Sequence, residues 1–400
     1  MFKRVLIANR GEIAVRIIRA CQEMGIETVA VYSDEDADAM HVRLADYSYN
    51  IGPADASESY LNIDAWMEAA ERTEADAVHP GYGFLSEDAD FAEMVTKAGM
   101  TWIGPWADTI RKVGDKDEAR AAMIPSGIPM SKGSTPLTSV EDAVEQAKDV
   151  GYPIILKPVA GGGGKGMLIA NSEDDLRNIL TIIDINKVKY YFEHYIEHSR
   201  HIEVQIVADN YGHVIHLGER ECSLQRRNQK LLEESPSIAL TPDRRAEVGA
   251  LAIKAAKSVH YNNIGTVEFL LDLKTNQFNF MEINPRIQVE HGVTEAVTGI
   301  DLVRTQIRIA AGESLDLQQE DVKFTGHAIE CRINAEDPDN NFMPSPGKID
   351  FFLEPGGPRV RVDSGVCAGL SISPYYDSLI AKIVVRGRTR GDAIKIMRRA

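Results

Sequence analysis

Hydrophobic and polar positions along the first hundred residues follow a pattern that predicts short strands separated by helices. The expected elements are strands at 3–8, 28–32 and 76–79 and a helix at 12–24. In the helix, Ile13, Ile17 and Cys21 fall on one face, and Gly25 ends the helical period. This strand–helix–strand rhythm predicts a parallel sheet covered by helices, with ligands bound near the carboxyl ends of the strands.

Further along, the pattern predicts a small hinged unit followed by antiparallel strand pairs. Prolines and glycines at 125–136 lead into a helix near 140–150, and a unit hinged in this way can close over a ligand like a lid. Apolar positions then alternate on both sides of 209–212 and again on both sides of 273–276, which predicts two hairpins. The expected domains are 1–114, then 115–325 with a lid at 131–204, and then 326–400.

The last residues have a helical pattern again. Residues 389–400 place Ala393, Ile394 and Met397 on one side of a helix, which then stops without a cap. We therefore expect the C-terminal domain to be truncated.

A glycine-rich segment follows the apolar run at 152–157. Five of the six residues 161–166 are glycine, which suits a backbone that bends tightly and approaches a ligand closely. Lys157 and Lys165 flank its bare amides with positive charge, so we expect a polyphosphate ligand. The common phosphate-loop pattern fails because Gly166 stands where Ser or Thr is needed, and the dinucleotide pattern fails because no acidic ribose ligand follows. A flexible linker is the alternative, but linkers rarely lie between two apolar strand-like runs.

Composition and charge narrow the class of protein. The chain has 400 residues, of which 44% are hydrophobic and 26% charged, as is typical of a globular protein with two or three domains. Its formal net charge of -16 argues against nucleic acid or an anionic membrane as the main partner. No stretch approaches the ~20 apolar residues of a membrane span, and the cysteines show no metal spacing. We therefore expect a cytoplasmic protein with reduced thiols and with no nucleic-acid or membrane partner.

A group of oxygen-bearing side chains lies on the second hairpin. Glu282 and Asn284 point the same way on one strand, and Glu268 holds the matching position on the preceding strand. Hard oxygen ligands near a phosphate-binding segment favour Mg²⁺ or Mn²⁺ held together with nucleotide phosphates. Surface ion pairing is the alternative, but the apolar neighbours Phe269 and Phe280 favour burial of this group.

The residues after this hairpin are candidates for catalysis. Arg286, Gln288 and Glu290 alternate along the chain. An arginine fork with an amide can hold a small planar oxyanion, and a carboxylate beside them can remove its proton. The basic cluster at 226–230 and His201 supply further polar groups. The alternative for the basic cluster is a solvated surface, and the alternative for His201 is a structural histidine.

Several segments together resemble one family. The chain is similar over its full length to biotin carboxylases, the ATP-grasp component of biotin-dependent carboxylases. The matching segments are 7–14 (IANRGEIA), 79–87 (HPGYGFLSE), the glycine-rich segment, 281–291 (MEINPRIQVEH) and 330–337 (ECRINAED). The resemblance implies an α/β fold with α+β character in the lid and C-terminal part, namely an ATP-grasp fold with a Rossmann-like N-terminal domain of parallel sheet and a mobile glycine-rich lid.

The resemblance also implies a reaction and partners. ATP phosphorylates bicarbonate to carboxyphosphate, which breaks down to CO₂ and phosphate beside biotin; phosphate then takes the biotin N1′ proton, and the biotin anion attacks CO₂. Because no Met-Lys-Met sequence occurs in the chain, biotin would be attached to a separate biotin carboxyl carrier protein. A carboxyltransferase subunit, which selects the acyl acceptor, and a homodimer are also expected.

Residue by residue, the resemblance assigns most of the polar side chains named above. Nucleotide-binding positions are Lys116, Lys157, Gly163, Gly164, Lys165, Met167, Glu193, His194, Ile196, His201, Gln225, Asn228 and Leu270. Metal-binding positions are Glu268, Glu282 and Asn284. Bicarbonate would be held by Arg286, Gln288 and Val289, with Glu290 as its base and Lys230 stabilising the charged intermediate. Arg332 would stabilise the biotin enolate, and Tyr82 would lie near the ureido ring, with a merely packed aromatic side chain as the alternative for Tyr82.

Three departures from the family pattern stand out. Asn228 replaces a common histidine, so its nucleotide contact would be lost or reshaped. Lys165 replaces the arginine of some members, which keeps the charge but loses the fork geometry. The segment between Met167 and Glu193 is shorter than in familiar bacterial members, so we expect a smaller lid. None of these departures removes a proposed metal or bicarbonate ligand.

Two other classes of protein are alternatives to a biotin carboxylase. Another ATP-grasp ligase, of the carbamoyl-phosphate or purine-pathway type, is the first; Arg332 together with Arg286 and Glu290 argues against the purine type more strongly than against the carbamoyl-phosphate type. A non-catalytic nucleotide-binding scaffold is the second. It predicts decayed metal ligands, whereas Glu268 and Glu282 are both present.

Overall fold

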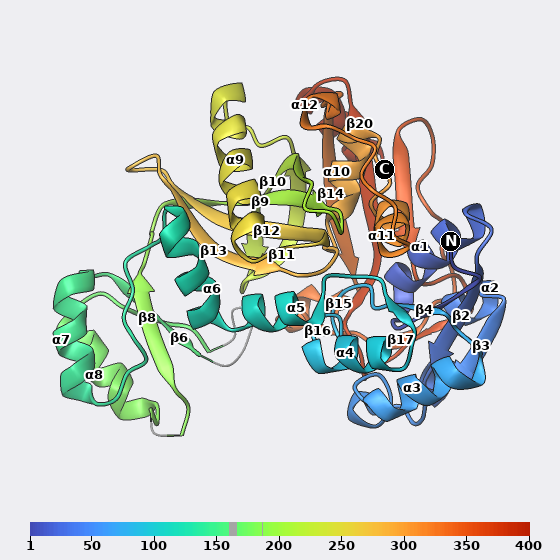
Figure 1. The fold of residues 1–400 in the computed structure, drawn as a ribbon, viewed down its shortest axis with the longest axis horizontal. Helices are drawn as coiled ribbons and strands as arrows, with labels where there is room; N and C mark the ends of the chain where they lie inside the picture. The colour runs from blue at the N-terminus through green and yellow to red at the C-terminus, as the bar shows by residue number, and fades with distance from the viewer. Residues whose placement is uncertain (160–165, 186) are drawn as a thin grey trace.

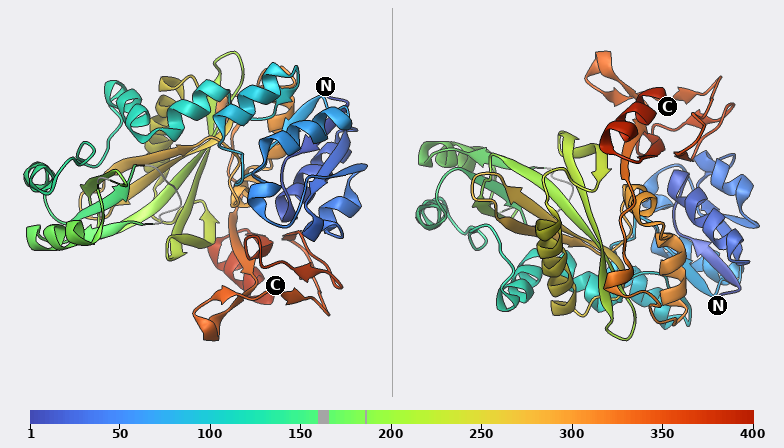
Figure 2. Two further views of the ribbon diagram at one scale, coloured as in Figure 1. Left: turned by 90° about the horizontal axis from the view of Figure 1, so that it is seen from below. Right: turned by 90° about the horizontal axis from the view of Figure 1, so that it is seen from above.

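Two large β-sheets organise the chain, which the computed structural model describes over residues 1–159, 166–185 and 187–400. Five parallel strands near the N-terminus form one sheet, and eight strands from the middle and end of the chain form the other. The lid and the N-terminal domain lie on opposite sides of the larger sheet, as Figure 1 and the two views of Figure 2 show. No helix in these three ranges is both long and apolar enough to cross a membrane.

The N-terminal domain contains the predicted parallel sheet, with strand order β3-β2-β1-β4-β5. Helix α1 buries its apolar positions Ile13, Ile17 and Cys21, as the helical period predicts. Gly25 follows with a φ of 71°, a left-handed conformation that glycine adopts without strain. The elements are β1 (Arg4–Ile7), α1 (Gly11–Glu23), β2 (Glu27–Tyr32), α2 (Met40–Leu44), β3 (Tyr47–Asn50), α3 (Ile63–Arg72), β4 (Ala77–His79), α4 (Ala89–Lys97) and β5 (Thr101–Trp102).

The lid has a small sheet and a hydrophobic core of its own. Its antiparallel strands lie in the order β7-β6-β8, and two helices cover them. Leu156, Leu176 and Phe192 are fully buried in this core, so the lid packs as a separate unit. After the connecting helices α5 (Ala107–Gly114) and α6 (Lys116–Met123), the lid elements are α7 (Val140–Val150), β6 (Ile154–Pro158), β7 (Leu168–Ala170), α8 (Glu173–Ile182) and β8 (Tyr190–His194).

The two predicted hairpins are confirmed as neighbours in the central sheet. Strands β9 and β10 pair on either side of 209–212, and β12 and β13 pair on either side of 273–276. Strand β9 begins at Ser199 and already belongs to this sheet. The elements are β9 (Ser199–Ala208), β10 (Val214–Arg226), β11 (Gln229–Ser235), α9 (Pro242–Ser258), β12 (Asn263–Asp272) and β13 (Phe278–Asn284).

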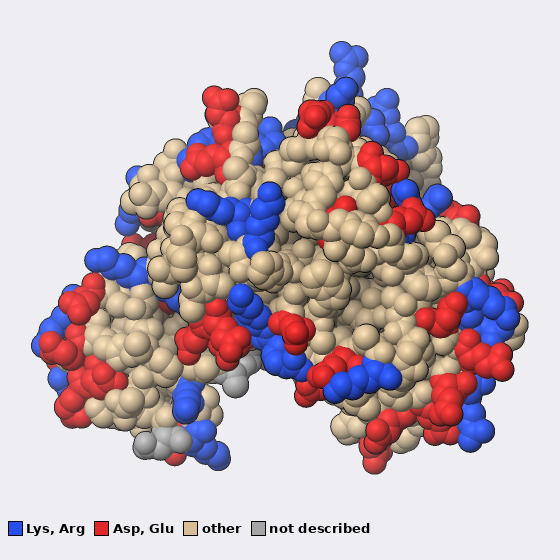
Figure 3. All heavy atoms as spheres, in the orientation of Figure 1, with Lys and Arg blue, Asp and Glu red and all other residues tan. Residues whose placement is uncertain are grey.

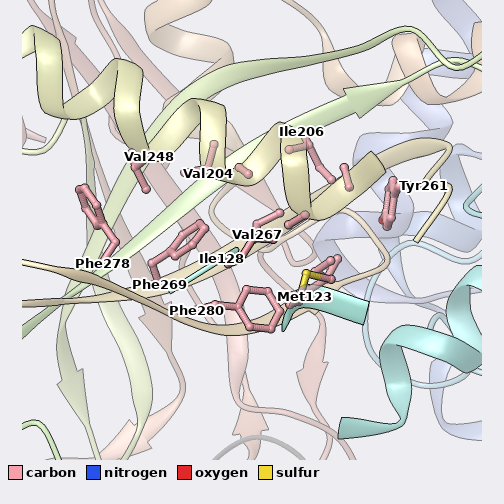
Figure 4. Close-up of a cluster of buried hydrophobic side chains, with 14 of the residues drawn as sticks. Met123, Ile128, Val204, Ile206, Val248, Tyr261, Val267, Phe269, Phe278 and Phe280 are labelled. Atoms are coloured by element: carbon pink, nitrogen blue, oxygen red, sulfur yellow. The ribbon is translucent and has the colours of Figure 1, made fainter. Parts of the chain in front are cut away.

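Helix α9 covers one face of the central sheet and forms a core with it. Alternate residues of the strands point to this face, among them Val204 of β9 and Val267 of β12. Figure 4 shows Phe269, Phe278 and Phe280 together in the cluster, and the ring centroid of Phe269 lies 6.3 Å and 6.1 Å from those of the other two. The opposite face carries buried polar side chains, Glu203 and Gln205 among them, together with apolar residues such as Val207.

The C-terminal part extends the central sheet instead of forming a separate layer. Strands β14, β20 and β18 continue it, so that the full order is β13-β12-β9-β10-β11-β14-β20-β18. The helix predicted at 389–400 is present as α12, and Thr389 caps its N-terminus. The elements are α10 (His291–Thr298), α11 (Leu302–Ala310), β14 (His327–Asn334), β15 (Glu336–Asp337), β16 (Met343–Pro344), β17 (Gly347–Lys348), β18 (Val360–Ser364), β19 (Ser371–Ile372), β20 (Leu379–Gly387) and α12 (Arg390–Arg399).

A second core fixes the N-terminal domain against the central sheet. Ile13 and Ile17 of α1 belong to one buried cluster with Val207 of β9, Ile215 of β10 and Ile307 of α11. Because these residues come from three parts of the chain, the N-terminal sheet and the central sheet hold a fixed relation to each other.

Candidate functional site

A cavity of about 560 Å³ lies between the lid, the central sheet and the residues that follow the N-terminal sheet. Figure 3 shows the surface notched between the lid and the N-terminal domain. Side chains of both signs and the apolar Ile110, Phe280 and Ile283 line the cavity. The predicted site residues in its wall are Lys116, Lys157, Met167, Glu193, His201, Gln225, Asn228, Lys230, Glu268, Glu282, Asn284, Arg286 and Gln288.

The nucleotide-side residues meet where the lid faces helix α6. Lys157 of β6 places its Nζ 2.7 Å from a carboxylate oxygen of Glu193, and Arg120 of α6 donates to the other oxygen at 3.0 Å. Lys116 stands at the start of α6 and its Nζ lies 3.5 Å from the Pro158 carbonyl. Burial lowers the pKa of Lys116, and Glu282 opposes this shift. The lid and α6 thus present two lysines to one cavity.

Other predicted nucleotide positions do not reach the cavity with their side chains. His194 turns its Nδ1 to the Gly151 carbonyl, 3.0 Å away. Ile196 is buried, and Leu270 pairs with His201 across strands β12 and β9 without lining the cavity. Their predicted adenine contacts therefore depend on backbone groups or on lid movement. The predicted positions Gly163, Gly164 and Lys165 lie outside the described residues.

Asn228 occupies the tight turn that joins β10 to β11. Arg226 pairs with Gln229, which leaves Arg227 and Asn228 as the two loop residues, with φ of 51° and 65°. A two-residue hairpin loop with positive φ at both positions favours asparagine. The asparagine in place of the family histidine therefore suits the backbone while its side chain still lines the cavity.

The predicted metal ligands meet at the β12–β13 pair. Glu268 and Glu282 are directly opposite in the register, and Asn284 donates from Nδ2 to Glu268 Oε1 at 2.8 Å. Glu268 and Asn284 are buried as predicted, whereas Glu282 is exposed. The expectation of burial was wrong for Glu282 because its strand turns that side chain toward the open cavity.

The donor set fits a divalent cation. Burial opposes ionisation of Glu268, but Lys230 and His201 hold its pKa well below the usual range, so this carboxylate is charged. Across the three described ranges, no hydrogen bond or ion pair engages the Glu282 carboxylate. Glu268, Glu282 and Asn284 all line the cavity. Carboxylate and amide oxygens of this kind are suitable ligands for Mg²⁺.

Arg286 and Gln288 form a polar cradle on the segment that leads from β13 to α10. Arg286 donates from Nη1 to Gln288 Oε1 at 3.0 Å and from Nη2 to Asn284 Oδ1 at 3.3 Å. Its Nε also bonds Glu87, and Gln288 donates to Glu268 Oε1 at 3.1 Å. The cradle therefore adjoins the metal ligands directly.

Glu290 is bound by one cation on each oxygen. Lys230 Nζ lies 2.9 Å from its Oε1, and Arg332 Nη2 donates to its Oε2 at 2.9 Å. Burial opposes ionisation of Glu290, but Lys230 and Arg332 hold its pKa well below the usual range. Burial would also lower the pKa of Lys230, but Glu268 and Glu290 raise it. At neutral pH the three side chains are therefore a carboxylate between two cations.

Tyr82 approaches this cluster from the N-terminal domain. Its hydroxyl donates to Glu12, and burial together with that carboxylate raises its pKa. Arg332 and Glu330 are close enough to act on it electrostatically. Tyr82 is half-buried, so both packing and contact with a ligand remain compatible with its position.

Four further residues of the site were not assigned a role from the sequence. Glu203 of β9 is fully buried and bonds Lys230 and Arg220. Glu233 of β11 accepts from Arg332 Nε at 2.8 Å. Glu87 pairs with Arg286, and Arg120 pairs with Glu193. Glu203 and Glu233 are acidic residues within apolar strands, and Glu87 ends the HPGYGFLSE segment, so each could have been noticed in the sequence. Their partners could not be predicted, because these lie far away in the sequence.

Three family descriptions match the chain in succession. These are the biotin carboxylase N-terminal domain at residues 1–110, the ATP-binding domain of the carbamoyl-phosphate synthase L chain at 115–318, and the biotin carboxylase C-terminal domain at 330–400. Biotin carboxylase 1 of Bacillus subtilis is 55% identical over 407 residues, which cover 100% of this chain and 90% of that protein. The 2-oxoglutarate carboxylase small subunit of Hydrogenobacter thermophilus is 49% identical, over 100% of this chain and 86% of its own.

Solved structures agree with these matches. A biotin carboxylase–β,γ-ATP complex from Campylobacter jejuni has a TM-score of 0.95 at 47% identity, covering 99% of this chain and 90% of that one. The biotin carboxylase domain dimer of Hydrogenobacter thermophilus 2-oxoglutarate carboxylase, with MgADP, ADP and bicarbonate, also has a TM-score of 0.95, at 48% identity over 100% of this chain and 89% of that one. The predicted ATP-grasp fold and the resemblance are confirmed. The chain belongs to the biotin carboxylase family.

Proposed function

We propose that this chain catalyses the ATP-dependent carboxylation of carrier-bound biotin by bicarbonate, through carboxyphosphate, giving carboxybiotin, ADP and phosphate. The carrying observation is the buried Glu290 carboxylate, which is bound between Arg332 and Lys230. Lys230 lines the same cavity as Lys116 and Lys157. This arrangement provides a proton acceptor and separate cations for two successive anions.

ATP and Mg²⁺ would occupy the cavity between lid and sheet. Lys116 and Lys157 would contact the phosphates, and Glu268, Glu282 and Asn284 would hold Mg²⁺, which supplies charge neutralisation for phosphoryl transfer. Lys157 is paired with Glu193 here, so phosphate binding would redistribute that pair. The relatives crystallised with β,γ-ATP and with MgADP support this occupant.

Bicarbonate would lie at the Arg286–Glu290 segment. Arg286, Gln288 and the Val289 amide would hold its oxygens, and Glu290 would accept its proton as it attacks the γ-phosphate. The lowered pKa of Glu290 means that it starts as a carboxylate. The Lys230 ammonium would stabilise the charge of carboxyphosphate.

Biotin would bind beside Arg332 after carboxyphosphate breaks down. Phosphate would take the N1′ proton, and the Arg332 guanidinium would stabilise the resulting enolate while CO₂ is attacked. Tyr82, on the N-terminal side, would lie near the ureido ring. Arg332 already bridges Glu233 and Glu290, so it is fixed in place before any ligand arrives.

The expected partners follow from the same function. We infer a biotin carboxyl carrier protein and a carboxyltransferase as partners, a homodimer as the assembly and the cytoplasm as the location. A relative crystallised as a domain dimer and one named as the small subunit of a carboxylase support the partners and the assembly.

We infer domains at 1–114, 115–325 and 326–400. Because β9 belongs to the central sheet, the lid is better drawn as 131–198 than as 131–204.

ADP formation by the purified chain tests the proposal. With MgATP present, ADP formation should require bicarbonate and should rise when free biotin is added. ADP formation that ignores both compounds would overturn the assignment. Formation that needs bicarbonate and ammonia, but not biotin, would instead indicate a carbamoyl-phosphate type of ligase.

The Arg332→Ala variant separates the two halves of the reaction. Bicarbonate-dependent ATP cleavage without biotin should fall much less than carboxybiotin formation, for which a loss of about 10²-fold or more is expected. Arg388→Ala, an exposed arginine beyond strand β20, is the control and should leave both rates unchanged. Equal losses of the two rates in Arg332→Ala would contradict the enolate role.

A further inference from the structure

Lys382 of strand β20 is a fully buried lysine beside the proposed bicarbonate site. Its side chain has no solvent exposure, and its Nζ donates to the Val289 carbonyl at 2.5 Å. In the sheet it lies directly opposite Arg332 on one neighbouring strand and Asp363 on the other. We propose that Lys382 is a positioning residue that fixes the bicarbonate loop, residues 285–290, through the Val289 carbonyl.

Side chains contact two neighbouring carbonyls of the bicarbonate loop. It lies between β13 and α10 and has no strand or helix of its own. The Gln288 carbonyl is 2.8 Å from Nδ1 of His291, and the Val289 carbonyl is held by Lys382. The Val289 carbonyl and the Glu290 amide belong to one planar peptide group, so holding that oxygen fixes the direction in which Glu290 leaves the backbone.

Lys382 is also contacted by two carboxylates outside the loop. Its Nζ lies 3.2 Å from Glu12 Oε1 on α1 and 3.9 Å from Asp363 Oδ2 on β18. Burial would lower the pKa of Lys382, but Glu12, Glu330 and Asp363 raise it, so the ammonium keeps its charge. Glu12 also accepts from the Tyr82 hydroxyl. One ammonium therefore joins helix α1, strand β18 of the central sheet and the bicarbonate loop.

Stability alone does not account for a lysine at this position. Taking an ammonium out of water is costly, and replacing a buried ion pair by apolar residues of similar volume is often neutral or stabilising. Val384 and Val385 on the same strand show that this sheet readily buries aliphatic side chains. A methionine would fill similar space, but it cannot donate to the Val289 carbonyl.

The Lys382→Met variant tests the proposal, which rests on the proposed function. We expect the KM for bicarbonate to rise by about ten- to a hundredfold, because a small displacement of reacting groups has effects of this size. The KM for ATP should stay within about twofold of wild type, since the lysines and carboxylates of the nucleotide end are untouched. A purely structural lysine would instead lower the yield of active enzyme and leave both KM values unchanged.

Arg386→Met is the matched control on the same strand. Arg386 also donates to a backbone carbonyl, that of Ala296 at 3.3 Å, but it is exposed and remote from the loop. Both KM values should remain at the wild-type level in this variant. An unchanged bicarbonate KM in Lys382→Met, or an equal rise in Arg386→Met, would overturn the positioning role.

A second variant decides the matter if Lys382→Met does not fold. Glu12→Gln weakens the hold on the ammonium and leaves Lys382 in place, so the bicarbonate KM should rise about threefold or more with the ATP KM unchanged. No rise in this variant would reject the proposal. Failure of the proposed function is distinguishable, because wild-type ADP formation would then show no dependence on bicarbonate at all.

Discussion

Two carboxylates of the site are each contacted by a basic side chain at both oxygens. Glu290 is bound by Lys230 and Arg332, and Glu268 by Lys230 and His201. Removing one partner from such a buried set leaves the other charge uncompensated, which is costly. Variants that keep the shape of the side chain therefore report on chemistry better than truncations do.

Glu290→Gln keeps the shape of the side chain and removes its basicity. Bicarbonate-dependent ATP cleavage should fall by about 10²-fold or more, because an amide cannot accept the bicarbonate proton. The dissociation constant for MgATP, measured by calorimetry, should remain within about twofold of wild type. The exposed Glu320→Gln is the control. An equally large loss of affinity for MgATP would contradict the proposed role of Glu290 as a base.

Glu233 gives the stability a dependence on pH. Burial raises its pKa to about 7 from an ordinary 4.5, although Arg332 opposes the shift. The folded state therefore keeps a proton that the unfolded state releases, and this contribution to stability is lost as the pH rises from 4.5 through 7.

The Glu233→Gln variant cannot titrate at this position, so it isolates the effect. The free energy of unfolding of wild type, relative to that of the variant, should fall between pH 5 and about pH 7 and level off above. Urea unfolding of both proteins across this range measures the difference. A difference that does not change with pH would contradict the raised pKa.

Among the elements, the lid carries its own core and depends little on the rest of the chain for packing. Leu156, Leu176 and Phe192 join β6, α8 and β8 in that core. Two ion pairs meet at Glu193 on β8, one from Lys157 within the lid and one from Arg120 on α6. The lid can therefore unfold locally without loss of the central sheet.

Phe192→Ala should destabilise the lid by about 3–5 kcal/mol, the usual cost of removing a buried phenylalanine ring. Hydrogen exchange should show faster exchange of the amides of β6 and β8, with β9 and β12 unchanged, and the KM for ATP should rise. Ile182→Ala is the control, because Ile182 lies at the end of α8 with 83% exposure. Equal loss of protection in the central sheet would show that the lid is not a separate unit.

In the whole molecule, Tyr376 joins the C-terminal part to the N-terminal domain. The Tyr376 hydroxyl lies 2.6 Å from Ser33 Oγ and donates to the Ala54 carbonyl at 2.6 Å. The Arg10 guanidinium lies 4.3 Å from the centre of the Tyr376 ring. This contact ties the C-terminal part to the N-terminal sheet.

Tyr376→Ala should lower the free energy of unfolding by about 2 kcal/mol, because it removes a half-buried ring and two hydrogen bonds. The neighbouring Tyr375 is 56% exposed, so Tyr375→Ala should change the stability by about 0.5 kcal/mol or less. Urea unfolding followed by tryptophan fluorescence gives both values. Equal effects of the two substitutions would argue against the contact.

The sequence alone determined the local elements and the residue types of the site. Helical period placed α1 and α7, alternation placed both hairpins, and Gly25 marked a helix end, because these signals depend only on neighbouring residues. The segments around Glu290 and Arg332 indicated the family for the same reason, since spacing within a short segment carries the chemistry.

Only the tertiary structure decided how these parts meet. It joined β14, β20 and β18 to the central sheet, turned Glu282 to the open cavity, and placed Lys382 under Val289, 93 residues away in sequence. Pairing between strands that are remote in the chain leaves no periodic trace in either strand. Which cation neutralises which carboxylate is fixed by that pairing, so the electrostatics of the site belong to the fold.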